Sequence, residues 1–218
     1  MNIYNEILEE LSLYNAKLVL VSKTKPVDQI LNFYDLGQRD FGENRVQEMA
    51  AKHEELPKDI LWHQIGHLQK NKVKYIAPFV HLIHSVDSLD LLKEINKRAK
   101  SNNRTIDVLL QIKIALEDTK FGLSQEDCIF LLNNKELNTL QNIRICGLMG
   151  MATFTDDEDE IIREFKSLKD FHSKLKSEYF SDNDYFKELS MGMSSDYKLA
   201  LREGATMVRI GSLIMGSR

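Results

Sequence analysis

A lysine at the end of an apolar run is the first residue in this sequence whose type and position suggest chemistry. Segment 17–24, KLVLVSKT, reads as a buried β-strand, and Lys23 stands at its carboxyl end. Burying an ammonium group is costly, and desolvation lowers its pKa, so the amine becomes a nucleophile toward carbonyl groups. Lys23 is therefore a candidate reactive amine, with a lysine that merely reaches the solvent as the alternative. Lys25 precedes Pro26 in the following loop and is the other candidate amine.

Two stretches that combine glycine with hydroxyl side chains are candidate phosphate sites. Residues 190–195 read SMGMSS and residues 209–212 read RIGS, and they end the last two predicted strands. In closed barrels of alternating strands and helices, phosphate commonly binds at this place, where backbone N–H groups and helix N-termini attract anions. We predict a phosphate cup here. The alternative for Ser194 and Ser195 is ordinary capping of the following helix.

The histidine spacing does not predict a metal site. His63 and His67 are four residues apart, as in a helical metal pair, but Gly66 and the pattern of LWHQIG indicate a strand. His81 and His84 are three residues apart in a predicted strand, so they are expected to face opposite sides. We therefore predict no metal ligands.

An alternation of short β-rich runs with longer amphipathic runs positions these residues. A first helix over 3–13 precedes eight predicted strands: 17–24, 40–44, 61–66, 79–87, 105–114, 142–151, 186–192 and 205–212. A helix follows each of the first seven, which makes the strands parallel. Eight such units are typical of a closed (β/α)8 barrel of the TIM type, usually of about 250 residues. We predict one α/β domain over residues 1–218, with an extra N-terminal helix; an open doubly wound sheet is the alternative.

Composition excludes several function classes. The 218 residues carry 29 Lys and Arg against 33 Asp and Glu, a net charge of −4, which argues against a broad nucleic-acid-binding face. No apolar run is long enough for a membrane span, and the acidic, amphipathic N-terminus does not read as a signal peptide. Cys128 and Cys146 form no disulfide framework. We expect a reduced, cytoplasmic protein, with a monomer as the simplest assembly.

Eight motifs follow one another from the first predicted strand to the last: VSKTKP (21–26), FGENRVQE (41–48), WHQIGHLQKNK (62–72), HSVDS (84–88), KFG (120–122), GLMGM (147–151), LSMGMSSD (189–196) and MVRIGSLIMG (207–216). In these motifs the chain resembles the pyridoxal 5′-phosphate (PLP) homeostasis proteins, the YggS/PROSC family. That family is similar to the barrel domain of alanine racemase, without the second, β-rich domain of that enzyme. The resemblance implies an alanine racemase N-terminal domain-like barrel.

The resemblance also implies roles for individual residues. Lys23 is expected to hold PLP as a Schiff base, with Arg209 near the pyridine nitrogen and Asn44 beside the lysine and the ring. Lys120 matches a family lysine near the mouth of the site. Arg45 is a departure, because a tyrosine is frequent at its place in the family.

The phosphate is expected on the stretches that hold Ser190, Gly192, Gly211 and Ser212. Ser212 stands where threonine is common in the family, which is a conservative departure.

The resemblance implies a protein that carries or buffers PLP inside the cell, with PLP-dependent apo-enzymes as recipients. A two-base racemase needs a base on each face of the substrate carbanion. In racemases of this resemblance the second base is a tyrosine from another domain, for which this sequence has no room. An arginine beside the pyridine nitrogen also keeps that nitrogen unprotonated, which weakens the electron sink. Two alternatives remain: a low-activity PLP-dependent amino-acid racemase, and a sugar-phosphate enzyme that uses Lys23 without a cofactor.

Overall fold

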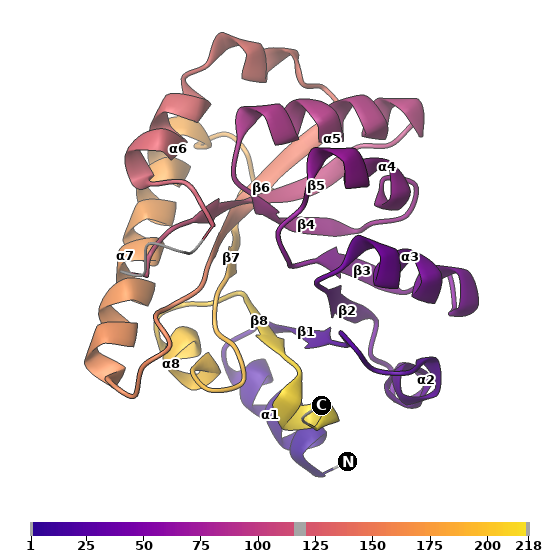
Figure 1. The fold of residues 1–218 in the computed structure, drawn as a ribbon. Helices are drawn as coiled ribbons and strands as arrows, with labels where there is room; N and C mark the ends of the chain where they lie inside the picture. Colours follow the sequence, from indigo (N-terminus) through magenta and orange to yellow (C-terminus); the bar gives the residue numbers. More distant parts are fainter. Residues whose placement is uncertain (1, 116–120, 217–218) are drawn as a thin grey trace.

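Eight parallel strands close into a barrel in the computed structural model, which describes residues 2–115 and 121–216 (Figure 1). The strands are β1 (Lys17–Val21), β2 (Asp40–Glu43), β3 (Leu61–Gln64), β4 (Leu82–Val86), β5 (Ile106–Ile112), β6 (Ile143–Gly150), β7 (Glu188–Ser190) and β8 (Met207–Ile210). Closure comes from parallel pairing of β1 with β8, which places Val19 opposite Arg209. The predicted (β/α)8 barrel is confirmed, and the open sheet is wrong.

Helices cover the outside of the barrel. They are α1 (Asn2–Leu13), α2 (Val27–Asp35), α3 (Val46–Glu55), α4 (Val73–Ile76), α5 (Leu89–Ser101), α6 (Gln125–Leu132), α7 (Glu158–Tyr179), α8 (Tyr197–Arg202) and α9 (Ser212–Met215), with short 3-10 turns at Lys70–Lys72 and Lys135–Thr139. Ser124 caps α6, because its side chain accepts a hydrogen bond from the N–H of Asp127.

All eight strands are shorter than predicted, and two of these differences affect the candidate site. β1 ends at Val21, so Lys23 lies two residues beyond the strand. β7 has three residues and ends at Ser190, although the N–H of Met191 and the carbonyl of Gly192 still form hydrogen bonds with Met207 and Arg209 of β8. The apolar pattern continues past the last strand residue in both places, and such a pattern does not show where a strand ends.

Side chains alternate between the barrel interior and the helix layer, as the two-residue period of a strand requires. Along β8, Met207 packs in the interior cluster with Val19 of β1 and Leu82 of β4, whereas Val208 and Ile210 pack against the helices. The same alternation directs a few polar side chains into an otherwise apolar interior. These are His63, His84, Ser190 and Arg209, all buried.

The N-terminal helix α1 covers the seam between β8 and β1. The closing helix α9 has only four residues, and α1 packs on both α9 and β1 (Figure 1). Tyr4 of α1 donates a hydrogen bond to Gln38 next to β2, and Tyr197 of α8 donates one to Glu10 of α1. The N-terminal helix α1 therefore covers the part of the seam between β8 and β1 that the four-residue helix α9 is too short to cover.

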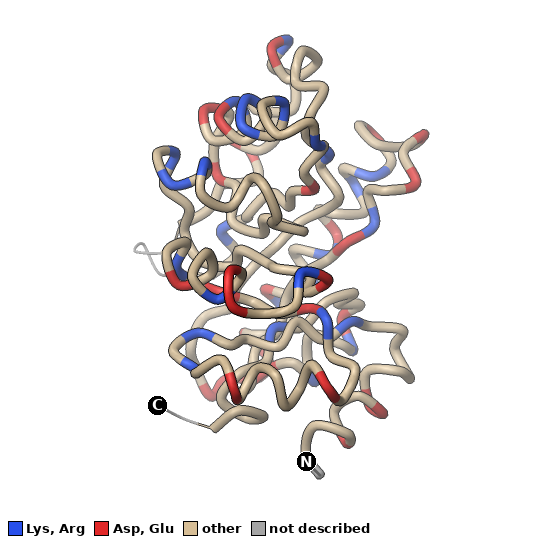
Figure 2. Tube along the Cα trace, turned by 90° about the vertical axis from the view of Figure 1, so that its right-hand side faces the viewer, with Lys and Arg blue, Asp and Glu red and all other residues tan. Residues whose placement is uncertain are grey.

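Charges of both signs are interleaved over the helices (Figure 2). Within residues 2–115 and 121–216, no helix combines the length and the apolar character needed to cross a membrane.

We predict that His172 makes the protein less stable below neutral pH. Its ring stacks on Phe186, and its Nε2 is buried with no hydrogen-bond partner in residues 2–115 and 121–216. Burial, together with the nearby charge of Lys176, lowers the pKa of His172 from 6.5 to about 4. A depressed histidine pKa contributes stability that is present above pH 6.5 and is lost as pH falls toward 4. His172→Phe should therefore flatten the fall in unfolding free energy over this window by up to about 1.4 kcal/mol per pH unit.

Urea denaturation at a series of pH values measures this slope. His67→Gln, at an exposed histidine, serves as the control and should keep the native slope. An unchanged slope in His172→Phe would contradict the assignment.

Candidate ligand site

A cavity of about 610 Å³ opens at the carboxyl ends of the strands, the end at which barrel active sites form. Five of the residues predicted from the sequence line it: Lys23, Asn44, Arg209, Gly211 and Ser212. Its other walls are Val21, Thr24, Lys25, Ile65, Met151, Phe154, Met193, Ser194, Ser195 and Gly216. Residues almost 200 positions apart therefore meet around one space.

Lys23 sits in a tight turn after β1 and not in the strand. The turn is closed by a hydrogen bond from the N–H of Lys25 to the carbonyl of Ser22, and Lys23 is exposed at the rim. The prediction of a desolvated lysine that ends a buried strand is therefore wrong, because β1 stops at Val21. Lys25 has its own contact, a hydrogen bond from its Nζ to the carbonyl of Gly216.

Thr24, the next residue of the turn, adopts a φ of +64°. Such a conformation is rare for a β-branched residue and persists only where the surroundings enforce it. Here the Thr24 N–H donates a hydrogen bond of 2.5 Å to the carboxylate of Glu48 in α3. The turn that carries Lys23 is thus fixed from below by α3.

A buried ion-pair network lies under this turn. The ammonium group of Lys52 donates hydrogen bonds of 2.7 Å to the carbonyl of Ser22 and to the carboxylates of Glu43 and Glu48. The Ser22 hydroxyl donates to the same oxygen of Glu43 at 2.6 Å, while the second Glu43 oxygen is buried and has no hydrogen-bond partner among the described residues. The network ties the end of β1 to β2 and α3.

The two carboxylates of this network are shifted in opposite directions. Burial raises the pKa of Glu43, and the hydrogen bonds from Lys52 and Ser22 only partly offset it. At the less buried Glu48, burial also raises the pKa, but the hydrogen bonds from Lys52 and Thr24 outweigh it and the pKa falls. Lys52 therefore compensates a carboxylate that the barrel has almost completely desolvated.

Arg209 carries a buried positive charge into the floor of the cavity. It is 4% exposed, and burial lowers its pKa to about 10, against the opposing charge of Asp196. The side chain is still a cation at neutral pH. Its guanidinium donates hydrogen bonds to the hydroxyl of Ser190 at 2.7 Å and to the carbonyl of Gly150 at 3.0 Å. These bonds fix the plane of the guanidinium group below the cavity.

A chain of hydrogen bonds runs from Arg209 through the barrel interior. Ser190 Oγ lies 2.9 Å from His84 Nδ1, His84 Nε2 lies 2.8 Å from His63 Nδ1, and His63 Nε2 lies 2.9 Å from an oxygen of Asp40. Desolvation, followed by the charges of His63 and Arg209, holds the pKa of His84 well below its usual value. At Asp40, burial raises the pKa, but the hydrogen bond and charge of His63 outweigh it and lower the pKa.

The direction of each hydrogen bond in this chain follows from its two ends. A carboxylate only accepts and a guanidinium only donates. With one proton on each ring, His63 donates to Asp40, His84 donates to His63 and Ser190 donates to His84, while Ser190 accepts from Arg209. Every donor and acceptor between the buried arginine and Asp40 is then used.

The histidine prediction needs a correction here. His81 and His84 do not face opposite sides, because the His63 ring contacts both, with ring centroids 5.4 and 5.1 Å away. His81 precedes the first residue of β4, so strand alternation does not apply to it.

A cluster of hydroxyl groups and a backbone N–H forms the opposite wall of the cavity. Ser194 Oγ lies 3.4 Å from the N–H of Gly211 and 3.2 Å from the hydroxyl of Ser212. The alternative of a serine cap is wrong, because α8 begins at Tyr197 and its N-cap is Asp196. The hydroxyl of Ser194 is therefore aimed at the cavity wall and not at a helix terminus.

Ser190 and Gly192 do not line the cavity. The Ser190 hydroxyl serves Arg209 and His84. Gly192 has a φ of +91°, and a Cβ there would lie 2.6 Å from the side chain of Ala200. It shapes the turn after β7, and the following residues, Met193 and Ser194, take its place at the cavity.

Gly211 allows close packing at the rim. A Cβ at this position would lie 2.9 Å from the carbonyl oxygen of Val21, so any side chain forces β8 and β1 apart. Its N–H remains directed toward Ser194 and the cavity wall.

Asn44 is held at the rim by backbone contacts. The side chain of Gln64, in β3, donates hydrogen bonds of 3.0 Å to the carbonyls of Asn44 and Gly66. The neighbouring Arg45 is exposed and begins α3 as its N-cap. Lys120 lies outside the described residues.

Sequence reasoning missed the residues that support the site. Lys52 is a lysine inside an amphipathic helix, and its i, i+4 spacing from Glu48 reads as a surface ion pair. The one available signal is that Lys52 lies on the same, buried face of α3 as Met49.

The fold and the cavity define a class: a single (β/α)8 barrel with an amine, a buried guanidinium and a hydroxyl cluster around one ligand-sized space. The alanine racemase N-terminal domain matches residues 4–218. A pyridoxal phosphate homeostasis protein from Aquifex aeolicus is 43% identical over 208 residues, 93% of this chain and 87% of that protein. Another protein of this name, from Synechocystis, is 36% identical over the full chain and 98% of its own length.

Solved structures agree with this classification. PipY of Synechococcus elongatus, solved with PLP bound, superimposes with a TM-score of 0.86 at 35% identity, covering 98% of this chain and 100% of PipY. Alanine racemase of Clostridium difficile shares only 17% identity, with a TM-score of 0.77 over 100% of this chain and 60% of the racemase, and shows the common fold. The chain belongs to the family of pyridoxal phosphate homeostasis proteins, within the alanine racemase N-terminal domain family.

We predict that Lys52→Met destabilises the protein by about 3–5 kcal/mol, because it leaves the Glu43 carboxylate buried without its cation. Urea denaturation measures the loss. The double variant Lys52→Met with Glu43→Leu removes both charges and should recover most of it. A single variant within about 1 kcal/mol of the native protein would show that the network is dispensable.

Proposed function

We propose that this protein binds PLP as a Schiff base on Lys23 and acts in PLP homeostasis as a carrier or buffer of the cofactor. The observation that carries the proposal is the arrangement of Lys23, Arg209 and the Ser194–Gly211–Ser212 cluster around one cavity. The relatives named for PLP homeostasis and the PLP-bound PipY structure support it.

The residues present fit the three reactive parts of PLP. The Lys23 amine condenses with the aldehyde and releases water, so that a C=N bond replaces the C=O bond. Arg209 donates to the pyridine nitrogen, and the hydroxyls of Ser194 and Ser212 with the N–H of Gly211 bind the phosphate. Asn44 lies at the rim beside the ring. The Ser190 and Gly192 stretch contributes through the turn that it forms, since neither residue lines the cavity.

The cation at Arg209 limits the chemistry that the cofactor supplies. A guanidinium donates a hydrogen bond to the ring nitrogen only when that nitrogen is unprotonated, and an unprotonated ring stabilises a carbanion poorly. The chain through Ser190, His84 and His63 keeps Arg209 in this role, because each group in it already has a partner. The arrangement favours holding the cofactor over turnover of amino acids.

The bases around the cavity support the same conclusion. Among the described residues that line it, the only ionisable bases are the amines of Lys23 and Lys25. Lys25 Nζ already donates to the carbonyl of Gly216. A two-base racemase requires a second base on the other face of the substrate. A low-activity racemase that uses Lys25 in this role is the rival function.

Exposure of Lys23 at the rim also supports a carrier. A Schiff base formed there is accessible to water or to the amine of a recipient PLP-dependent apo-enzyme, so the cofactor can leave. The two cysteines are free and buried, and burial raises the pKa of both thiols to about 12, which suits a reducing compartment. We propose a cytoplasmic monomer that delivers PLP to apo-enzymes.

The central test is to identify the amine. Lys23→Ala should abolish the visible absorbance of the Schiff base and retain weaker PLP binding through the phosphate, whereas Lys25→Ala should keep the absorbance. Borohydride reduction followed by peptide mass analysis should find the pyridoxyl group on Lys23. If the pyridoxyl group is found on Lys25 in the native protein, Lys23 is not the Schiff-base residue. A native protein that stays colourless with added PLP would refute the function.

A second prediction concerns the phosphate. Charge-assisted hydrogen bonds contribute about 1.5–3 kcal/mol each, so Ser194→Ala and Ser212→Ala should each weaken PLP binding by roughly tenfold to a hundredfold. Pyridoxal, which has no phosphate, should bind more weakly than PLP binds to either variant. Neither substitution should change the affinity for pyridoxal. Ser177→Ala, on the outer face of α7, is the matched control. Equal affinity for pyridoxal and PLP would contradict the assigned cluster.

The third prediction separates the carrier from the racemase. The PLP-loaded protein should exchange the α-proton of alanine and serine in heavy water very slowly and should not interconvert their enantiomers. Proton nuclear magnetic resonance measures the exchange. Racemisation at ordinary enzyme rates, lost in Lys25→Ala, would establish the rival function.

A further inference from the structure

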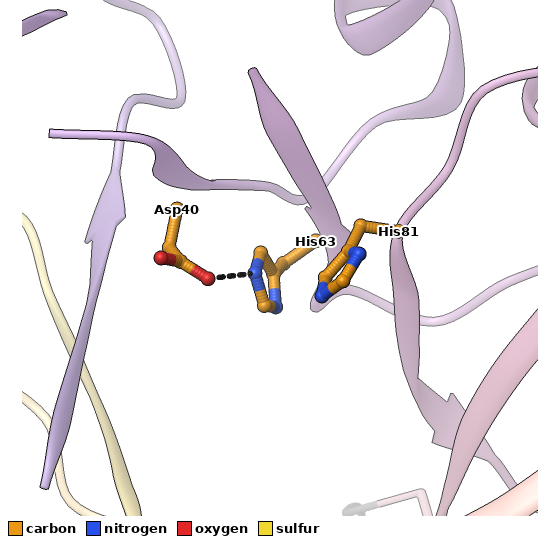
Figure 3. Close-up of side chains that lie close together, drawn as sticks. All are labelled: Asp40, His63 and His81. Carbon is orange, nitrogen blue, oxygen red and sulfur yellow. Dashed lines mark hydrogen bonds and ion pairs between the residues drawn. The ribbon is translucent and has the colours of Figure 1, made fainter. Parts of the chain in front are cut away.

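Three potential metal ligands meet at the mouth of the barrel opposite the cavity. Asp40 is the first residue of β2, His63 lies within β3, and His81 immediately precedes β4. One ligand atom from each lies within 4.8 Å of the other two. Figure 3 shows the Asp40 carboxylate directed at the His63 ring, with the His81 ring on the other side of His63.

We propose that Asp40, His63 and His81 form a binding site for a divalent transition metal such as Zn²⁺, at the opposite end of the barrel from the PLP cavity. One carboxylate and two imidazoles are a ligand set that suits Zn²⁺, with the remaining position open to water. Metal–ligand bonds of about 2.0–2.1 Å require the His81 ring to turn toward Asp40. The ring is free to do so, because it makes no hydrogen bond to any residue in the described parts of the chain.

The support around the ligands matches what metal sites need. A metal-bound histidine is normally oriented by a hydrogen bond at its other ring nitrogen, and His63 Nδ1 has such a partner, 2.8 Å away, in His84 Nε2. His63 is fully buried and so cannot move away from the site. The backbone N–H of His81 bonds to the carbonyl of Trp62, which fixes the third ligand beside β3.

Metal binding is coupled to the hydrogen-bond chain in the barrel. The His63 Nε2 that donates to Asp40 must lose its proton to bind a metal. Its ring then carries the proton on Nδ1 and donates to His84 Nε2, and the His84 proton moves to Nδ1 and points to Ser190. Each ring keeps one proton, so none is released, and the Ser190 hydroxyl turns away from His84. Nitrogen-15 shifts of both rings therefore report occupancy.

One nearby charge opposes the metal. Lys17 Nζ lies 3.9 Å from the Asp40 carboxylate, on a side chain that is 46% exposed. Lys17→Gln removes this cation and should strengthen Zn²⁺ binding severalfold. The same substitution at Lys74, an exposed lysine of α4, should have no effect.

Calorimetric titration of the full chain with Zn²⁺, and visible spectra with Co²⁺, test the site. We expect one ion per chain, and a dissociation constant raised by more than about 100-fold in Asp40→Asn and in His81→Ala, beyond the cost of losing a residue that only orients a ligand. His67→Gln and Lys23→Ala should bind as the native protein does. Because the His81 ring makes no hydrogen bond, His81→Ala should fold normally and decides the question if Asp40→Asn does not.

No binding by the native protein, or unchanged binding in His81→Ala, would overturn the proposal. The result is separate from the PLP assignment. Zinc binding without Schiff-base absorbance would support the metal site and contradict the PLP site. Schiff-base absorbance without zinc binding would support the PLP site and contradict the metal site.

Discussion

The buried guanidinium of Arg209 is the constraint on which the centre of this barrel depends. A cation placed inside an apolar barrel is costly unless it is hydrogen-bonded. The carbonyl of Gly150 and the hydroxyl of Ser190 accept hydrogen bonds from the guanidinium of Arg209. Ser190 in turn needs His84, His84 needs His63, and His63 ends on the carboxylate of Asp40. One charge at the ligand cavity is thus connected, through a chain of hydrogen-bonded polar side chains, to Asp40 at the other end of the barrel interior.

A second buried charge fixes the turn that carries Lys23. Glu43, fully desolvated at the end of β2, requires a cation, and Lys52 supplies it from α3. Because Lys52 also bonds to Ser22 and Glu48, and Glu48 to Thr24, the same ion pair fixes the strained turn that carries Lys23. Lys23 itself is left exposed. The protein thus positions the amine through its turn and leaves its side chain accessible, an arrangement that suits reversible loading of a cofactor.

The two ends of the barrel have different chemistry. At the carboxyl ends of the strands, an amine, a guanidinium and hydroxyl groups surround a cavity, which matches a phosphorylated aldehyde. At the amino ends, a carboxylate and two imidazoles converge on a point, which matches a metal ion. The hydrogen-bond chain from Ser190 to Asp40 runs between the two ends.

Several features followed from the sequence because they are local or periodic. Alternating strands and helices specified the parallel barrel, and the motifs around Lys23, Asn44, Arg209, Gly211 and Ser212 brought five residues correctly to one cavity. Other features depend on contacts between distant residues. The end of β1 at Val21 is set by its pairing with β2 and β8, and for this reason the burial predicted for Lys23 was wrong. The hydroxyl of Ser190 is taken up by Arg209 and His84, and Gly192 packs against Ala200, so neither residue is placed on the cavity wall. The convergence of His63, His81 and His84 arises from barrel closure and from His81 lying outside the strand.

The sequence by itself determined the order and period of the elements and the types of reactive residue, because these are properties of neighbouring positions. Tertiary structure alone decided which polar groups are buried, and therefore which must pair, because burial depends on how all eight strands close.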